Sequence, residues 1–372
     1  MVNLGKRVCF LRFSSDSMLA EQGRLVYWVV NTFAQAGLKC FVQMNYGDKD
    51  IPRLAEKAVQ LPGVEIVEKA PRDSDGALYV FDVPDPKLVG NKWAKQIQLG
   101  FDVFSVYPFQ KPLILPFPIH PVHYEHGTTE RIETLRSSMK DIRILFSGDF
   151  RGYDKTWVTY PDAKLPRARI VEILREKIPD RVFFVNEQSQ LDSLLINGCT
   201  DRCVLIDTSR LWIDDRIWLQ VLARAEFFLA PPGIVMPMCH NIVEAMAVGT
   251  VPITNYPEWF DPDLGDGVEC LCFGDAPSLI NAVECALAMP QDCLQAMRRH
   301  AIRYYEQHLT PESFVRKVQG HPSPNITVLL LTEKYVAQNT RRLGPRSVLI
   351  RGVDKAGRWA WVRELLRFGR GD

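Results

Sequence analysis

The sequence predicts an α/β fold in which two Rossmann-like domains face a central cleft. Apolar runs of strand length alternate with amphipathic segments of helical period in both halves, which is typical of parallel strands joined by crossover helices. The length of 372 residues suits two domains of ordinary size. With 47% hydrophobic and 24% charged residues, the chain can also bury two cores.

The first domain is expected to span residues 1–126. Its predicted elements are strands at 7–13, 38–43, 64–67 and 77–81 and helices at 18–36, 51–60 and 91–99. Prolines interrupt the strand-like runs at 101–107 and 113–115, so this region is expected to approach the cleft. The polar residues 127–140 form a predicted linker.

The second domain is expected at 141–320, followed by a basic segment at 321–372. Its predicted elements are strands at 141–148, 181–185, 202–206, 227–230, 251–254 and 268–273 and helices at 167–178, 215–225, 240–247, 276–289 and 291–307. Ligands are expected at the carboxyl ends of these strands, as in other doubly wound sheets.

The stretch 226–260 is the most informative part of the chain. Pro231-Pro232-Gly233 ends a strand, and the predicted helix at 240–247 follows. A helix N-terminus carries free N–H groups and a positive dipole end, which suits phosphate. Glu244, one turn further in, can accept hydrogen bonds from sugar hydroxyls. Alternatively, Glu244 is a surface residue and Asn241 a simple helix cap.

Glu244-Ala-Met-Ala-x-Gly249-x-x-Pro252-Ile, preceded by the helix-to-strand pattern of 216–233, resembles the donor-site segment of GT-B glycosyltransferases, especially retaining and exostosin-like ones. The resemblance covers residues 200–290. It implies a nucleotide-sugar donor bound by the second domain and a saccharide acceptor bound by the first. Many retaining members place an acid eight positions before this glutamate, where the present chain has Met236, so inversion and retention both stay open.

Two loops complete the predicted donor site. Ser147-Gly148 opens a loop in which Arg151 or Lys155 would clamp the phosphates, as the resemblance implies, although Lys155 also fits a solvated turn. The loop 207–210 ends a strand where such folds hold the base. The expected donor-binding residues are Gly148, Lys155, Asp207, Ser209, Arg210, Gly233, His240, Asn241 and Glu244.

The expected catalytic residues are Glu244 and Arg151, with His123 and Asp16 as candidate bases. Asp16 also fits a helix cap, and His240 a structural role. The motif Asp261-Pro-Asp263 matches a metal-binding Asp-x-Asp by letter only. We therefore expect no metal, and no cofactor beyond the nucleotide-sugar itself.

Composition narrows the partners and the compartment. The net charge of +1 gives no reason to expect nucleic acid, and the nine scattered cysteines favour reduced thiols in a cytoplasm. No apolar run is long enough for a signal peptide or a membrane span. The basic, aromatic segment 358–370 predicts peripheral contact with an anionic membrane, unless it packs across the two domains.

The functional hypothesis is therefore a glycosyltransferase that moves a sugar from a nucleotide-sugar to a saccharide acceptor, such as a lipid-linked glycan, for polysaccharide biosynthesis. Two alternatives use the same scaffold. One is a nucleotide-sugar epimerase or phosphorylase, and the other is a non-catalytic module that binds a nucleotide or a sugar. No Walker loop, G-x-G-x-x-G or G-x-S-x-G motif supports another class of enzyme.

Overall fold

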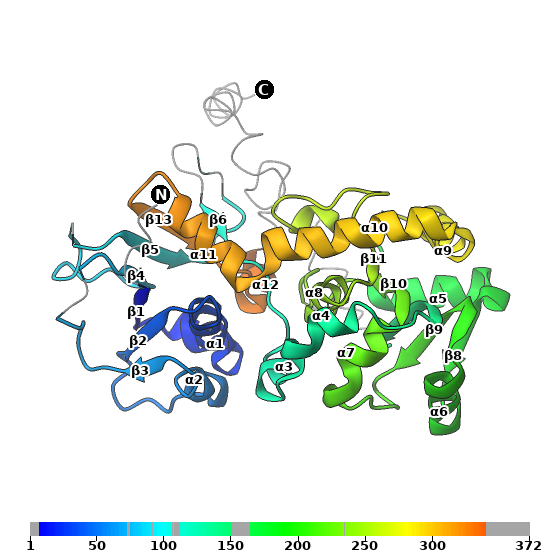
Figure 1. Cartoon of the computed structure of the whole chain (residues 1–372), viewed down its shortest axis with the longest axis horizontal. Helices are drawn as coiled ribbons and strands as arrows, with labels where there is room; N and C mark the ends of the chain where they lie inside the picture. Colours follow the sequence, from blue (N-terminus) through cyan, green and yellow to red (C-terminus); the bar gives the residue numbers. More distant parts are fainter. Residues whose placement is uncertain are drawn as a thin grey trace, which may run out of the picture. The chain divides into compact units, whose positions relative to one another are not determined.

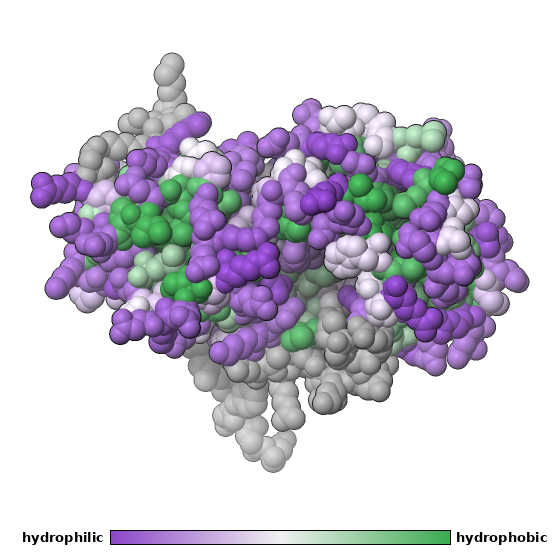
Figure 2. All heavy atoms as spheres, turned by 90° about the horizontal axis from the view of Figure 1, so that it is seen from below, coloured by the Kyte–Doolittle hydropathy of each residue, from purple (hydrophilic) through white to green (hydrophobic). Residues whose placement is uncertain are grey.

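A computed structural model describes residues 7–72, 75–90, 92–105, 107, 112–150, 164–233 and 235–339. The chain divides into two compact units, Met1–Pro116 with Thr310–Asp372 and Phe117–Leu309. Each unit is built around its own parallel sheet, which confirms the predicted α/β class with two sheets. In the view of Figure 2, hydrophilic residues cover much of the described surface and apolar residues form separate patches.

The first unit holds a sheet of seven described strands in the order β3-β2-β1-β4-β5-β13-β6, with neighbouring strands parallel. The strands are β1 (Val8–Phe13), β2 (Lys39–Met44), β3 (Val64–Ile66), β4 (Leu78–Phe81), β5 (Lys95–Gly100), β6 (Leu113–Ile114) and β13 (Asn325–Leu329). The chain thus returns from the second unit to add β13 between β5 and β6 (Figure 1). Helices α11 and α12 belong to this return, so the predicted second domain ends earlier than 320.

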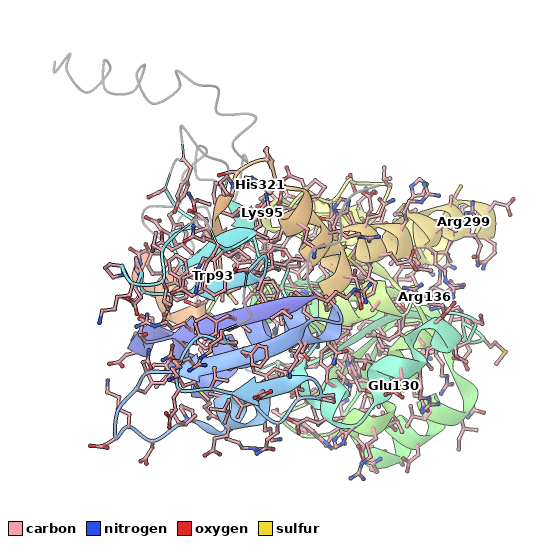
Figure 3. All side chains as sticks on the ribbon, turned by 60° about the vertical axis from the view of Figure 1, so that its left-hand side comes forward. Trp93, Lys95, Glu130, Arg136, Arg299 and His321 are labelled. Atoms are coloured by element: carbon pink, nitrogen blue, oxygen red, sulfur yellow. The ribbon has the colours of Figure 1, made fainter. Side chains whose placement is uncertain are left out.

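The described helices of the first unit are α1 (Ala20–Gln35), α2 (Arg53–Ala58), α11 (Pro311–Gly320) and α12 (Glu333–Asn339). The predicted helix at 91–99 is wrong, because residues 95–100 form β5. Its sequence alternates exposed or half-buried glutamines with the buried Ile97 and Leu99, which is a period of two. Lys95, at the start of β5, donates to the carbonyls of His321 and Ser323, and Figure 3 shows Lys95 and His321 close together.

The second unit holds a sheet of six described strands in the order β12-β11-β10-β7-β9-β8, again parallel. The strands are β7 (Ile142–Gly148), β8 (Val182–Val185), β9 (Cys199–Asp207), β10 (Ala225–Ala230), β11 (Val251–Thr254) and β12 (Leu271–Cys272). From β7 the chain passes to the edge strand β8 and returns to β9 beside β7. It then crosses to β10 on the other side of β7 and continues outward through β11 to β12, so the winding direction changes beside β7. Such a switch point opens a crevice at the carboxyl ends of the strands.

The described helices of this unit are α3 (Pro121–Glu125), α4 (Ile132–Leu135), α5 (Arg167–Lys177), α6 (Gln188–Asn197), α7 (Asp215–Ala223), α8 (His240–Ala247), α9 (Ala276–Ala288) and α10 (Gln291–Tyr304). The predicted helix at 240–247 is confirmed to the residue. The predicted boundary after 126 is displaced, because the unit already begins at Phe117. The stretch 127–140 is part of this unit and contains α4, which packs on α7.

The end of α8 shows why the sequence stops the helix there. Gly249 has a φ of 74°, in the left-handed region that favours glycine, and it follows the last helical turn. Thr250 then donates its N–H to the carbonyl of Ala245. The chain turns directly into β11, which places α8 between the end of β10 and the start of β11, with its N-terminus at the carboxyl edge of the sheet.

Candidate functional site

A pocket of about 410 Å³ opens within the second unit, at the carboxyl ends of β7 and β9 and the N-termini of α7 and α8. This volume lies in the range of ordinary ligand sites. The lining residues come from α3 and its N-cap, from the end of β7, from the loops that follow β7 and β9, and from α5, α7 and α8: His120, Val122, His123, Ser147, Gly148, Asp149, Arg167, Thr208, Trp212, Ile213, Asp215, Trp218, Cys239, Asn241 and Glu244.

Glu244 forms part of the pocket wall, with 1% of its surface exposed. Its Oε2 accepts a hydrogen bond from Trp218 Nε1 at 2.8 Å, and its Oε1 accepts one from the His120 backbone N–H at 3.0 Å. The alternative of a surface glutamate is therefore wrong. Both oxygens already have partners inside the protein, so the first role of this carboxyl is to hold α7 and the start of α3 against α8.

His123 completes the wall behind Glu244. Its Nδ1 lies 3.0 Å from Thr128 Oγ1, and this hydroxyl donates to the His123 carbonyl at 3.2 Å. Because the hydroxyl proton is used there, Thr128 accepts from Nδ1, and the neutral imidazole carries its proton on Nδ1. The other nitrogen, Nε2, lies 3.6 Å from Glu244 Oε1. The two titratable groups therefore face one another across a buried contact.

Burial favours the neutral forms of both groups. It raises the pKa of Glu244 to about 7, against the hydrogen bonds from Trp218 and His120 that lower it. Burial also lowers the pKa of His123 to about 4, assisted by the neighbouring His120 and His126. Near neutral pH the His123 imidazole is therefore uncharged, and the Glu244 carboxyl beside it is close to its pKa.

Arg167 brings positive charge to the opposite wall. It is the first residue of α5, and its guanidinium lies 6.0 Å from the Phe146 ring, in cation–π contact. The described residues place no carboxylate within ion-pair distance of it, and its buried Nε has no hydrogen-bond partner among them. An arginine in this state is suited to an anionic ligand.

The N-terminus of α8 faces the same space through Cys239 and Asn241. Asn241 donates from Nδ2 to the Ser147 carbonyl at 3.4 Å, which ties the helix start to the end of β7. The positive end of the helix dipole is thereby directed at the pocket that Arg167 also lines. Burial raises the pKa of the Cys239 thiol, while Arg167 lowers it.

An aromatic side chain stands on the β9 side of the pocket. Trp212 follows the strand end and keeps 68% of its surface exposed, although large aromatic residues are mostly buried. Thr208 lies nearby in the same loop and also lines the pocket. A flat, exposed indole beside a hydroxyl is suited to stacking on a planar ring such as a nucleobase.

Several predicted residues organise the loops around the pocket. Asp207 is 8% exposed, and its Oδ1 accepts the N–H groups of Phe150 and Ser209 at 3.2 and 3.0 Å. Ser209 and Arg210 are exposed and lie outside the pocket lining. Gly148 does line the pocket, and an added Cβ would come within 2.8 Å of the Phe146 ring.

Three further predicted residues lie away from the lining. Gly233 lies close to the Met236 carbonyl, which a Cβ at this position would meet at 2.5 Å, so only glycine allows this approach. His240 packs on Phe117, and its Nδ1 lies 2.7 Å from the Pro118 carbonyl, so it joins α8 to the start of this unit. Asp16 lies in the first unit, where it is exposed and paired with Lys49 at 2.5 Å.

The remaining predictions fall outside the described residues. These are the phosphate clamp by Arg151 and Lys155 and the basic segment 358–370. Conversely, the sequence reasoning missed Arg167, Trp212 and Trp218. The only local signal for Arg167 was its position at the start of a predicted helix, and nothing local distinguished the two tryptophans from core residues.

No model of a known protein family matches the chain, and no curated protein sequence matches it. Among solved structures, it is similar to a glycosyltransferase from Rickettsia africae ESF-5, with a TM-score of 0.45, 8% identity and coverage of 83% of this chain and 96% of that chain.

A second similar structure is Anabaena Alr3699/HepE, solved in complex with UDP-glucose. Its TM-score is 0.41 with 12% identity, covering 83% of this chain and 98% of that chain. A third is AviGT4, a glycosyltransferase involved in avilamycin A biosynthesis, with a TM-score of 0.40, 13% identity and coverage of 83% and 95%. These likenesses are distant in sequence and partial in structure.

The described residues include no helix that combines the length and the apolar character that crossing a bilayer requires. They also contain no group of three or more His, Cys, Asp or Glu residues arranged to hold a metal ion.

Proposed function

We propose that the protein is a glycosyltransferase and that the pocket of the second unit binds its nucleotide-sugar donor. One observation carries the proposal: an arginine without a carboxylate partner among the described residues and a helix N-terminus meet at the strand ends of a doubly wound sheet. Both features favour a phosphate ligand. The resemblance of the 216–252 segment to glycosyltransferase donor sites selects a nucleotide-sugar among phosphate ligands.

The pocket suggests a role for each wall. The pyrophosphate would lie between Arg167 and the first turn of α8, and the base would stack beside Trp212. When the bond between the sugar and the phosphate breaks, negative charge grows on the departing nucleoside diphosphate. Arg167 and the α8 dipole would stabilise that charge, while the acceptor hydroxyl forms the new glycosidic bond and loses its proton.

Glu244 has a supporting role in this proposal. Its carboxyl holds Trp218 and the His120 backbone, so it shapes the inner wall. Each oxygen retains a second lone pair that a donor hydroxyl can use when the sugar enters. The same proposal has two further parts: the first unit binds a saccharide acceptor, and the segment 358–370 contacts a membrane.

The test is nucleotide binding by an Arg167→Ala variant, measured by calorimetry with uridine, guanosine and adenosine diphosphates. A charge-assisted hydrogen bond contributes about 1.5–3 kcal/mol, so the best-bound nucleotide should lose about tenfold to hundredfold in affinity. Arg169→Ala is the matched control, because Arg169 lies on the same helix, pairs with Glu172 and does not line the pocket. If both variants and the wild type bind the nucleotide with equal affinity, the pocket is not the donor site.

Turnover separates the proposed activity from the alternatives. Each nucleotide-sugar is incubated with the protein, with and without a mixture of saccharide acceptors, and the products are resolved by chromatography. A glycosyltransferase releases nucleoside diphosphate in step with glycosylated acceptor. Isomerised donor without an acceptor would indicate an epimerase, and binding without any turnover would indicate a binding module.

A further inference from the structure

Two cysteines outside the pocket form a close pair in the second unit. The sulfur atoms of Cys270 and Cys272 lie 3.4 Å apart, near the edge strand β12. The backbone is extended there: Cys270 forms a bridge with Asp266, and Cys272 pairs with Thr254 of β11. Residues two apart on a strand point to the same side, which explains how the two thiols meet.

A covalent bond between the sulfurs requires a local bend of the backbone. Two residues apart on an extended chain put the Cα atoms about 6.6 Å from one another, at the upper end of the range of about 4.4–6.8 Å that disulfides span. The parallel Cβ atoms are about equally far apart and must approach to about 3.5–4.5 Å for the bond to close. The sulfurs need to approach by about 1.4 Å to reach the disulfide length. The edge position of β12 helps, because only β11 pairs with it in the described sheet.

The surroundings of the two thiols differ. Cys270 is fully buried, and its thiol donates weakly to the Gly265 carbonyl at 3.6 Å. Its pKa is raised by the hydrogen bond with Cys272 and by burial, and further by the nearby Asp266 and Glu269. Cys272 is half-buried and therefore reachable from solvent. Its backbone N–H donates to Asp266 Oδ1 at 2.8 Å, which holds the strand in place.

We propose that Cys270 and Cys272 are a redox-active dithiol that small disulfides, such as glutathione disulfide, convert to an intrachain disulfide. This inference is independent of the proposed sugar transfer. Cys272 is the attacking group because it alone of the pair is accessible, and Cys270 is the resolving group because it lies in contact with it.

The chemistry balances in two exchange steps. The Cys272 thiol loses its proton, and the thiolate attacks one sulfur of the small disulfide, releasing one small thiol. Cys270 then loses its proton and attacks the Cys272 sulfur, which breaks the mixed disulfide and releases the second small thiol. The protein gains one S–S bond, and the small disulfide is reduced to two thiols.

In the experiment, the reduced, folded full-length chain is treated with glutathione disulfide, and the remaining thiols are then alkylated. The product is digested with a protease that cleaves on the N-terminal side of aspartate residues. Cleavage at Asp266 and Asp275 yields the peptide 266–274, in which Cys270 and Cys272 are the only cysteines. In the wild type this peptide should lose two hydrogens and recover them with dithiothreitol. The exposed Cys285 and Cys293, released in separate peptides, should carry glutathione instead.

Two variants test the order of the steps. Cys270→Ser should trap glutathione on Cys272, because the resolving thiol is missing. Cys272→Ser should leave Cys270 as a free thiol, because it is buried. The wild-type peptide decides the proposal even if a variant fails to fold: free thiols in 266–274 when Cys285 is fully modified, or bonds from this pair to other cysteines, would overturn it.

Discussion

The buried contact between Glu244 and His123 predicts two opposite dependences of stability on pH. Glu244 has a pKa of about 7 in the folded protein against an ordinary value of 4.5. Its folded form therefore binds the proton more tightly than the unfolded form. The resulting stability is complete below pH 4.5 and is lost as the pH rises through 7.

His123 acts in the other direction. Its pKa is about 4 in the folded protein against 6.5 ordinarily, so the unfolded chain binds the proton more tightly. The stability from the neutral imidazole is complete above pH 6.5 and is lost as the pH falls through 4. Each shift corresponds to about 3 kcal/mol at about 1.4 kcal/mol per tenfold change in proton affinity. In the wild type the two slopes largely cancel between pH 4.5 and 6.5.

Single replacements should expose one slope each. Glu244→Gln removes the acid, so its stability relative to the wild type should rise by about 3 kcal/mol from pH 4.5 to 7. His123→Asn keeps an N–H donor for Thr128 but cannot titrate, so its relative stability should fall by about 3 kcal/mol from pH 4 to 6.5.

The assay is urea unfolding followed by tryptophan fluorescence at steps of pH, with both single variants and the double variant. The glutamine also faces two N–H donors and loses one hydrogen bond, but that cost does not vary with pH. Only the slope is therefore diagnostic. If both variants keep the pH dependence of the wild type, or if their slopes share one sign, the two groups do not form the buried neutral pair described above.

Three further predictions concern single contacts. Trp218→Phe keeps a six-membered aromatic ring but removes the pyrrole ring whose N–H donates to Glu244 Oε2, so thermal unfolding should show a loss of about 1–3 kcal/mol, and the loss should grow from acid to neutral pH. Gly249→Ala should cost more than Gly267→Ala, because both positions have a positive φ but only at 249 does a Cβ meet Ile302 at 2.9 Å; equal unfolding free energies would contradict this packing. Glu21→Ala should speed amide exchange at the start of α12, whose Glu333 N–H donates to Glu21 Oε1 at 2.7 Å, while Glu21→Gln should preserve protection.

Local pattern was enough for much of the fold. The helix at 240–247 was predicted to the residue because its apolar positions repeat with helical period and Gly249 follows as a stop signal. The prediction missed strand β5 because strands of a parallel sheet are usually continuous apolar runs. In β5 two glutamines alternate with the buried apolar residues, so the segment lacks such a run. The linker at 127–140 was misread because its polar residues cover a helix that still packs on α7.

The candidate site divides in the same way. Sequence alone indicated that Glu244 and the N-terminus of its helix belong to one functional segment, because they are only about one helical turn apart. It did not reveal the partners of Glu244, because Trp218 and His120 are 26 and 124 positions away along the chain. It also pointed to Arg151 and Lys155 for the phosphates, whereas Arg167 is the cation that the described pocket contains.

The sequence by itself therefore determined the class of fold, two doubly wound sheets, and the segment in which a ligand site should be sought. Periodicity and turn residues act over a few positions, so they are readable from the order of the amino acids. Only the tertiary structure decided that Glu244 is buried and hydrogen-bonded on both oxygens, that His123 lies beside it and that Arg167 lines the pocket. Those relations depend on which strand ends meet at the switch point, and this is settled by packing across the whole unit.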